Sequence, residues 1–143
     1  MVFPQKLILL VPVALALAAC TQGDMTTSEA PLSAENAAQL AERFEDKVAG
    51  TPIRCVNVSR LGNPVPYGDR VLVYSGMAGT EYRNNLLSQC RGLDDDAIFV
   101  TKLHGAQLCR GDQIQTVDRF SGISGMPCRL GEFIPYRPAK KKN

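Results

Sequence analysis

The segment Arg70–Ser75 (RVLVYS) carries the strongest strand signal in the chain and decides its fold class. Its centre, Val-Leu-Val-Tyr, joins β-branched, aliphatic and aromatic residues, which favour strands. The glycine-bounded stretch Gly76–Gly79 follows as a predicted turn. Thr80–Asn84 is then predicted to return beside the first strand. The middle of the chain is therefore expected to form an antiparallel hairpin.

Short runs of the same kind, separated by glycine and proline, continue from Thr51 towards the C-terminus. The other predicted strands are Ile53–Val58, Ala97–Leu103, Gln113–Phe120 and Arg129–Tyr136, the last stopped by Pro135 and Pro138. Loops or turns are predicted at Arg60–Asp69, His104–Asp112 and Ser121–Pro127, and a short helical turn or irregular stretch at Leu86–Leu93. The intervals between strands are too short for regular βαβ crossovers. Residues 51–137 are therefore predicted to form a small antiparallel sheet or a partly open barrel.

One helix is predicted ahead of these strands, within residues 33–50. Ser33 is a typical N-cap residue, and Glu35 in the first turn suits the helix dipole. The apolar residues recur at helical spacing and form one stripe: Ala37, Leu40, Ala41, Phe44 and Val48. Gly50 and Pro52 end the pattern, which predicts a helix over residues 34–49. We expect the stripe to dock on the domain's own core, so the fold class is α+β, mainly β, with one N-terminal helix.

The N-terminus has the charged, apolar and small-residue order of a secretory signal. Lys6 precedes an apolar run, Leu7–Leu17, which is shorter than the roughly 20 residues that span a bilayer. Ala18, Ala19 and Cys20 follow, and Leu17–Cys20 resembles the lipobox of bacterial lipoproteins. The resemblance implies that Cys20 carries a diacylglyceryl thioether and that residues 1–19 are removed. The alternative is a plain signal peptide cut near Ala19, with Cys20 incidental.

The expected location follows from this anchor. Residues 20–32 are polar and predict a lipidated cysteine with a flexible tether, and by resemblance Thr21 favours the outer membrane of a Gram-negative bacterium, on its periplasmic face. The expected partners are thus the membrane, reached through the lipid on Cys20, and an envelope protein that the sequence does not identify. The formal net charge of +2 gives no strong attraction for nucleic acid. The basic tail, residues 138–143, is expected to be a solvated terminus rather than a contact with phosphate head groups.

Four further cysteines remain for the folded domain: Cys55, Cys90, Cys109 and Cys128. An even count in an exported domain predicts two disulfides, and three pairings are open. We favour Cys90–Cys109 with Cys55–Cys128, because the first would close a hairpin region and the second would tie the first strand to the last segment. No Cys-x₂-Cys pair occurs and the chain has one histidine, so neither a metal site nor another cofactor is expected.

Three motifs offer chemistry, and each has a more ordinary interpretation. His104 could act as an acid or base, but it precedes Gly105 at the end of a predicted strand. Asp94–Asp96 could contribute oxygens to a cation site, although three adjacent acids in a loop are usually solvated. Arg110–Asp112 is the tripeptide that integrins bind, but a turn is the expected structure. No catalytic constellation emerges, so the protein is not expected to be an enzyme.

Cysteine and strand patterns over residues 51–136 resemble an uncharacterised family of small exported proteobacterial proteins, catalogued as a domain of unknown function. The segments that carry the resemblance are Arg54-Cys55, Asp69–Tyr74, Tyr82–Cys90, Leu108–Ile114 and Cys128–Phe133. The resemblance implies an exported domain with disulfides and transfers no activity or site residue.

The expected function is that of a lipid-anchored envelope protein with a non-enzymatic interaction or structural role. The alternative is an inhibitor of a cell-wall hydrolase, because small disulfide-bonded periplasmic lipoproteins that block lysozyme are similar in size and anchoring. Ser75–Tyr82 would then be the inserting hairpin. A third alternative is an enzyme that uses His104 with a nearby carboxylate.

Overall fold

The computed structural model describes residues 32–94, 96–103 and 105–140. Within them the chain forms the helix α1 (Ala34–Arg43), the strands β1 (Lys47–Ala49), β2 (Cys55–Asn57), β3 (Pro64–Tyr67), β4 (Val71–Ser75), β5 (Glu81–Asn85), β6 (Ile98–Thr101), β7 (Gln107–Cys109), β8 (Gln113–Val117), β9 (Cys128–Arg129) and β10 (Phe133–Pro138), and the 3₁₀ turns η1 (Val58–Arg60) and η2 (Met77–Gly79). No helix of this part of the chain is long and apolar enough to cross a membrane.

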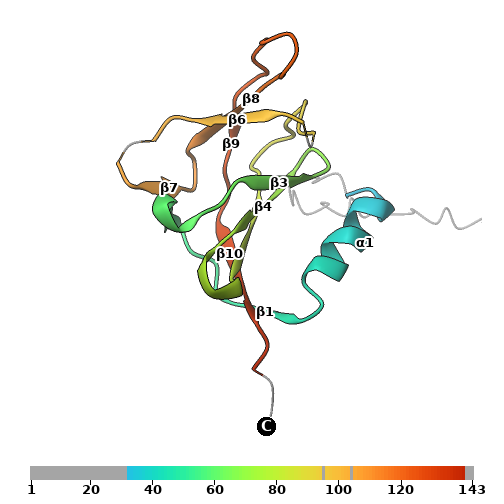
Figure 1. Cartoon of the computed structure of the whole chain (residues 1–143), viewed down its shortest axis with the longest axis vertical. Coiled ribbons are helices and arrows are strands. Elements are labelled where there is room, and N and C mark those ends of the chain that lie inside the picture. Colours follow the sequence, from blue (N-terminus) through green and yellow to red (C-terminus); the bar gives the residue numbers. More distant parts are fainter. Residues whose placement is uncertain (1–31, 95, 104, 141–143) are drawn as a thin grey trace, which may run out of the picture. The chain divides into compact units, whose positions relative to one another are not determined.

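The strands form three antiparallel sheets (Figure 1). The five-stranded sheet has the order β1-β10-β5-β4-β3, the three-stranded sheet has the order β6-β8-β9, and β2 pairs with β7. The sheets do not close into a barrel. The predicted class, mainly β with antiparallel sheets, one helix and two disulfides, is thereby confirmed.

The predicted hairpin is the centre of the five-stranded sheet. β4 pairs with β5 from Val71↔Asn85 to Ser75↔Glu81. Alternate residues of a strand face opposite sides, and both faces of β4 are covered: Leu72 packs in the main core and Val73 under α1, each with 0% exposure. The main core lies between the sheets and consists of Val56, Leu72, Tyr74, Leu86, Cys90, Leu108, Ile114, Cys128, Leu130 and Phe133.

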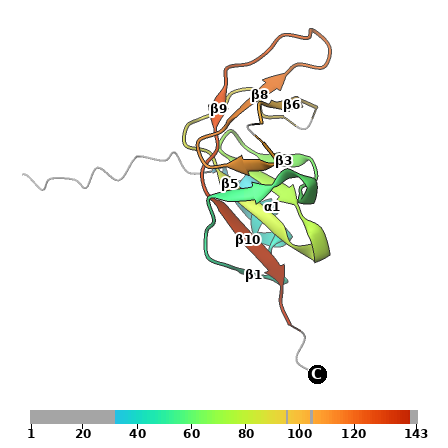
Figure 2. The same cartoon turned by 90° about the vertical axis from the view of Figure 1, so that its left-hand side faces the viewer.

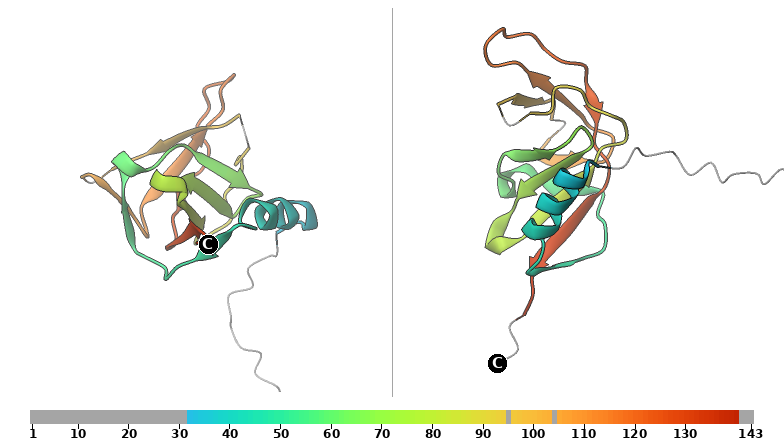
Figure 3. Two further views of the ribbon diagram at one scale, coloured as in Figure 1. Left: turned by 60° about the horizontal axis from the view of Figure 1, so that its bottom comes forward. Right: turned by 90° about the vertical axis from the view of Figure 1, so that its right-hand side faces the viewer.

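Helix α1 covers the outer face of the five-stranded sheet (Figure 3). The predicted cap is confirmed, since Ser33 Oγ accepts a hydrogen bond from the Asn36 amide at 3.2 Å. The prediction of a helix to residue 49 is wrong, because α1 ends at Arg43 and residues 47–49 form β1 beside β10. The backbone of Val48 therefore pairs in a sheet, and its side chain is 61% exposed rather than part of the helical stripe.

Two prolines explain why β3 was predicted to be loop. Pro64 and Pro66 lie within β3, inside the predicted loop Arg60–Asp69. β3 is an edge strand whose one neighbour is β4. Proline is tolerated on a sheet edge because an amide hydrogen is not needed there. The pairing from Pro64↔Tyr74 to Tyr67↔Val71 makes this segment a strand and corrects the prediction.

Pro135 does not stop the last strand as predicted, because it lies inside β10. The Pro135 carbonyl accepts a hydrogen bond from the Gly50 amide at 2.7 Å. The N–H and C=O of an antiparallel strand residue point to the same side. The missing amide hydrogen of Pro135 therefore faces the end of β1, and the ladder between β10 and β5 loses no donor.

The favoured disulfide pairing is wrong, although the prediction of two disulfides is confirmed. The bonds are Cys55–Cys109 and Cys90–Cys128. Residues 104–112 were predicted to be a turn, but they contain β7, which pairs with β2 and places Cys109 directly opposite Cys55. Cys128, at the start of β9, reaches the segment that follows β5.

Candidate functional site

The structure separates the residues that the sequence nominated for chemistry. Cys20, Asp95 and His104 lie outside the described residues, so their predicted roles stay predictions. Arg110–Asp112 forms the predicted turn between β7 and β8, where the Asp112 carboxylate accepts a hydrogen bond from the Cys109 amide at 2.8 Å. Gly111 there has a φ of +93°, which favours glycine.

The loop between β8 and β9 is the most unusual surface of the described chain. We call residues 118–127 the apolar loop. It projects beyond the three-stranded sheet (Figure 2). Three of its large apolar side chains are exposed to solvent: Phe120 by 88%, Ile123 by 70% and Met126 by 81%. Folding alone gives no reason to hold three such side chains in water, since each contributes to stability only when it is buried.

Asp118 organises the first half of this loop. One oxygen of its carboxylate accepts hydrogen bonds from the amide of Phe120 at 3.0 Å and from the amide and hydroxyl of Ser121 at 2.7 and 2.8 Å. The backbone closes the same turn, because the Asp118 amide donates to the Ile123 carbonyl at 3.0 Å and the Gly122 amide donates to the Asp118 carbonyl at 2.9 Å. Gly122 supplies the positive φ, +68°, that this turn requires.

These hydrogen bonds also set the charge of the loop. The donors of Ser121, the backbone amide first and the hydroxyl second, lower the pKa of Asp118, and the Phe120 amide adds to the shift. They favour the carboxylate over the neutral acid. The loop is thus held by an ionised aspartate at neutral pH.

The base of the loop is fixed to the body of the domain. The Gly125 amide donates to the Thr116 carbonyl at 2.7 Å, and the Gln115 side-chain amide donates to the Gly125 carbonyl at 2.7 Å. A Cβ at Gly125 would lie 2.6 Å from Thr116 Oγ1, so glycine permits this close approach. The buried disulfide Cys90–Cys128 ties down the next residues. The loop therefore presents its apolar side chains from a hydrogen-bonded and covalently anchored frame.

Apolar exposure extends from the loop onto β6. Ile98 and Val100 alternate with Phe99 along the strand and are 44% and 46% exposed, whereas Phe99 packs against the main core. Ile98 lies opposite Val117, directly before the loop. Strand and loop thus expose apolar side chains at the same end of the molecule.

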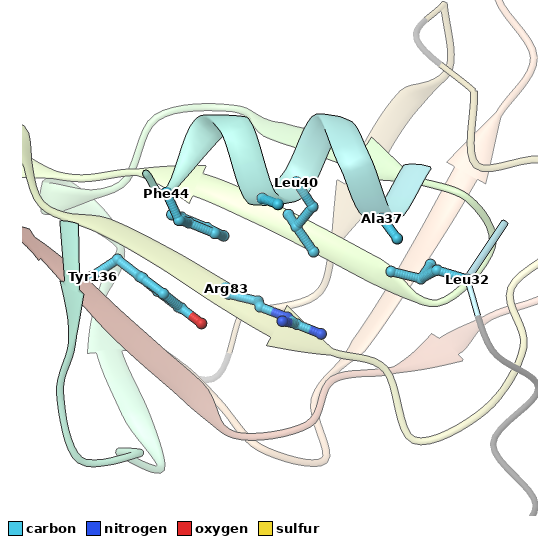
Figure 4. Close-up of a pocket in the computed structure, with 7 residues that line it drawn as sticks. Leu32, Ala37, Leu40, Phe44, Arg83 and Tyr136 are labelled. Atoms are coloured by element: carbon cyan, nitrogen blue, oxygen red, sulfur yellow. The ribbon is translucent and has the colours of Figure 1, made fainter. Parts of the chain in front are cut away.

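A second candidate is a groove of about 290 Å³ between α1 and the five-stranded sheet (Figure 4). Leu40 on α1 and Phe44 directly after α1 line one side of the groove, and Arg83 on β5 and Tyr136 on β10 line the other. Phe44 stacks on Tyr136 with ring centroids 3.8 Å apart. The guanidinium of Arg83 has no carboxylate within ion-pair distance among the described residues. The lining suits an apolar group with an anionic end, but Leu40 and Phe44 are themselves buried and account for the groove as helix packing.

A polar cluster beside this groove fastens the helix. The Arg43 guanidinium donates to Glu81 Oε1 through Nε at 3.0 Å and Nη2 at 2.8 Å, and to the Tyr67 hydroxyl at 3.1 Å. Lys47 Nζ lies 3.4 Å from the other carboxylate oxygen. Burial alone would lower the pKa of Arg43, but the hydrogen bonds and charge of Glu81 outweigh it and raise the pKa. Every member has a structural partner, so the cluster is a clamp rather than a reactive site.

The tip of the β4–β5 hairpin is a third exposed feature. Met77 is 64% exposed there, and Ala78 has a left-handed φ of +53°. The Gly76 amide donates to the Thr80 carbonyl at 2.7 Å and closes the tip. A non-glycine residue in this conformation is uncommon and strained, and such strain occurs at functional positions.

Acidic residues surround a smaller hollow but form no metal cluster. Asp94, Asp96 and Asp118 line a space of about 220 Å³ with Arg119 and Phe120. Within residues 32–94, 96–103 and 105–140, no group of three or more His, Cys, Asp or Glu side chains is arranged to hold a metal ion.

The predicted loop Ser121–Pro127 is confirmed, but the predicted strand Gln113–Phe120 is too long, because β8 ends at Val117 and Phe120 lies in the apolar loop. The exposure of the loop's apolar residues was not predicted. The available signal was the presence of Phe120, Ile123 and Met126 within a segment rich in glycine and serine. Periodicity could not reveal it, because a loop has no regular face.

Comparison with known proteins supplies the family and no activity. No curated protein and no solved structure matches the chain significantly. Residues 4–143 match the family of unknown function DUF6491. The match agrees with the uncharacterised family expected from the cysteine and strand patterns.

Proposed function

The chain belongs to DUF6491, a family of unknown function, and we propose that it is an exported, lipid-anchored envelope protein that binds a partner protein through the apolar loop. The observation that carries the proposal is the exposure of Phe120, Ile123 and Met126 on a loop whose backbone is held by hydrogen bonds at Asp118 and Gly125. Nothing in this proposal requires catalysis.

The ordered backbone of the apolar loop is the reason to interpret its exposed side chains as a binding surface. A binding loop that is already fixed before association loses less conformational entropy when the partner arrives. The Asp118 and Gly125 hydrogen bonds provide that order. Aromatic and methionine side chains are enriched at the centres of protein interfaces. Phe120 and Met126 have the side-chain types expected of such a centre.

The anchor and the location are part of the same proposal. The lipobox-like Leu17–Cys20 supports lipidation of Cys20, and Thr21 supports the outer membrane. A lipid anchor would keep the binding loop within the envelope, so its partner would be another envelope protein. Metabolic labelling with a palmitate analogue should mark the full chain, and Cys20→Ser should abolish the label. Labelling that survives this substitution would refute the anchor.

A second candidate is inhibition of a cell-wall hydrolase by the β4–β5 hairpin. The conformation of the tip favours it, because Ala78 has a left-handed φ and the Met77 side chain is exposed. Insertion of such a tip into an enzyme cleft would require a fixed backbone. This candidate predicts that an excess of the full chain lowers lysozyme activity. An unchanged rate of hydrolysis would contradict it.

Site-specific photocrosslinking in intact cells tests the main proposal. A photoreactive amino acid is placed at Phe120 in the full chain and, as a matched control, at Val48, which is 61% exposed but lies on β1. We expect one discrete protein adduct from position 120 and none from position 48. The same adduct from both positions, or adducts with lipid and abundant porins alone, would contradict the proposal. The photoreactive amino acid is also placed at Met77, and an adduct from position 77 with none from position 120 would favour the hairpin candidate.

A further inference from the structure

Strand β6 leaves one edge of the three-stranded sheet without a strand partner in the described chain. We propose that two copies of this protein pair through this edge, β6 against β6 in antiparallel orientation, and form a continuous six-stranded sheet across a two-fold axis. This dimer is distinct from the apolar loop's binding role and does not depend on it.

The other edge strands of the described residues are interrupted by proline, charged or very short, and β6 is none of these. β3 carries two prolines, β1 has three residues with Lys47 at its start, and β9 has two residues. β2 and β7, the two strands of the smallest sheet, have three residues each. Proline, lysine and short length are the devices that prevent edge-to-edge pairing. β6 has four residues, Ile-Phe-Val-Thr, with no proline, glycine or charge. Among the edge strands of the described residues, β6 is therefore the longest one that lacks proline and charge.

The sequence around β6 is complementary to itself. With Phe99 on the two-fold axis, Ile98 of one copy lies opposite Val100 of the second copy, and Val100 lies opposite Ile98. Apolar residues directly opposite each other stabilise a strand pair. The half-exposed side chains of Ile98 and Val100 would thus cover each other.

Charged residues at the two ends of β6 also fit this antiparallel register. Asp96 lies in the turn before the strand and Lys102 directly follows the strand, so antiparallel pairing about Phe99 brings Asp96 towards Lys102 of the second copy, twice. Both residues are exposed, and neither takes part in an ion pair among the described residues. A parallel arrangement would instead set like charges side by side, so the charge pattern selects the antiparallel dimer.

The dimer would also change what the apolar loop can do. Ile98 pairs with Val117, which leads directly into the loop, so joining two β6 strands brings two loops into one assembly. Two linked binding sites on one object raise the effective affinity for a partner that carries two epitopes.

A charge-swap experiment tests the pairing. The full chain is co-expressed with two different tags and purified in a mild detergent, and co-purification of the second tag measures self-association. D96K or K102D, present in both copies, should reduce co-purification roughly tenfold, because two attractions become two repulsions. A D96K copy should however capture a K102D copy, and the double variant D96K/K102D should associate with itself as the wild type does.

Rescue separates a lost contact from a lost fold, because a misfolded single variant would not be captured by the other. In the wild type, a carbodiimide that joins carboxylates to amines should link Asp96 to Lys102 of the second copy, detected between isotopically light and heavy chains. The proposal is overturned if the wild type does not co-purify, or if the single variants co-purify as well as the wild type. Phe120→Ser should leave co-purification unchanged, so failure of the proposed loop function would be seen separately.

Discussion

The five-stranded and three-stranded sheets differ in the burial of the apolar side chains on their outer faces. In the five-stranded sheet both faces of β4 are covered, so Leu72 on one face and Val73 on the other are each 0% exposed. In the three-stranded sheet the inner face joins the core, but Ile98 and Val100 on the outer face of β6 are 44% and 46% exposed. Helix α1 makes the difference, because it covers the outer face of one sheet and nothing in the described chain covers the other.

The contrast distinguishes residues that hold the fold from residues available for binding. Burial of a large apolar side chain stabilises a protein by about 1.5–3 kcal/mol, and an exposed one contributes little. Burial in the folded domain explains the apolar residues of the five-stranded sheet. The three-stranded sheet and the apolar loop also carry exposed apolar residues, which contribute little to the stability of the fold. Substitutions in the two regions should therefore differ in their effect on stability.

Removal of the disulfide between the two regions should have the largest effect. Cys90–Cys128 closes a separation of 38 residues, for which chain entropy predicts about 4 kcal/mol. Both cysteines are buried, so Cys90→Ser/Cys128→Ser also places hydroxyls in the core. Denaturant unfolding should show a greater loss than for Cys55→Ser/Cys109→Ser, whose cysteines are half-buried. Chain entropy alone would make the loss slightly larger for Cys55–Cys109, which closes 54 residues, so a smaller loss for Cys90–Cys128 would contradict the contribution of core burial.

Leu40→Ala should destabilise the protein by about 3 kcal/mol, because Leu40 is 4% exposed between α1 and the sheet. Ile98→Ala is the matched truncation in the other region and should cost less than about 1 kcal/mol in the free energy of unfolding. Chemical denaturation of both variants measures the two values. If both substitutions lowered the free energy of unfolding equally, Ile98 would belong to the residues that stabilise the fold, and the contrast between the two sheets would be wrong.

Asn84→Ala should cost about 2 kcal/mol. Asn84 is fully buried, donates to the Gly131 carbonyl at 3.0 Å and accepts from the Gly131 amide at 2.9 Å, so its loss leaves two buried backbone groups unpaired. Half-buried Asn85, next along β5, is the control, and Asn85→Ala should cost less. The free energies of unfolding compare them, and a smaller effect at Asn84 would contradict the pairing.

The order of the apolar loop should depend on pH through Asp118, with the smallest effect on overall stability. The pKa of Asp118 is lowered in the folded protein, so its contribution is present above the ordinary carboxyl range and is lost as the pH falls through the lowered pKa. Hydrogen exchange corrected for its intrinsic pH dependence should show the Phe120 and Ser121 amides losing protection on acidification. Asp118→Ala should expose both amides at neutral pH, and protection in this variant equal to the wild type would refute the role of Asp118.

The sequence predicted local structure well where one pattern dominated. The β4–β5 hairpin and the Ser33 cap needed only nearby residues. The errors arose where a distant partner decided the outcome. Residues 47–49 were predicted to be helical, but they pair with β10 as β1. Part of a predicted turn forms β7, because it pairs with β2. That second error also led to the wrong cysteine pairing.

The candidate site was less predictable than the fold for a related reason. Exposure of Phe120 or Ile123 is a property of the assembled surface, and a single sequence does not show which apolar residues find cover. Asn84 illustrates the same limit in the core, because its partner Gly131 lies 47 residues away. A Cβ at Gly131 would lie 1.9 Å from the Asn85 carbonyl oxygen, a constraint that emerges only from the folded backbone.

The most direct test of the central claim measures stability and binding on one variant. Phe120→Ser/Ile123→Ser/Met126→Ser removes the exposed apolar side chains of the loop from the full chain, and Val48→Ser/Met77→Ser/Leu87→Ser removes three others that are 61%, 64% and 50% exposed. Both variants should unfold within about 0.5 kcal/mol per substitution of the wild type. We predict that chemical crosslinking in intact cells captures the envelope partner with the wild type and the control variant, but not with the loop variant. Loss of the fold in the loop variant, or partner capture equal to that of the control, would contradict the account.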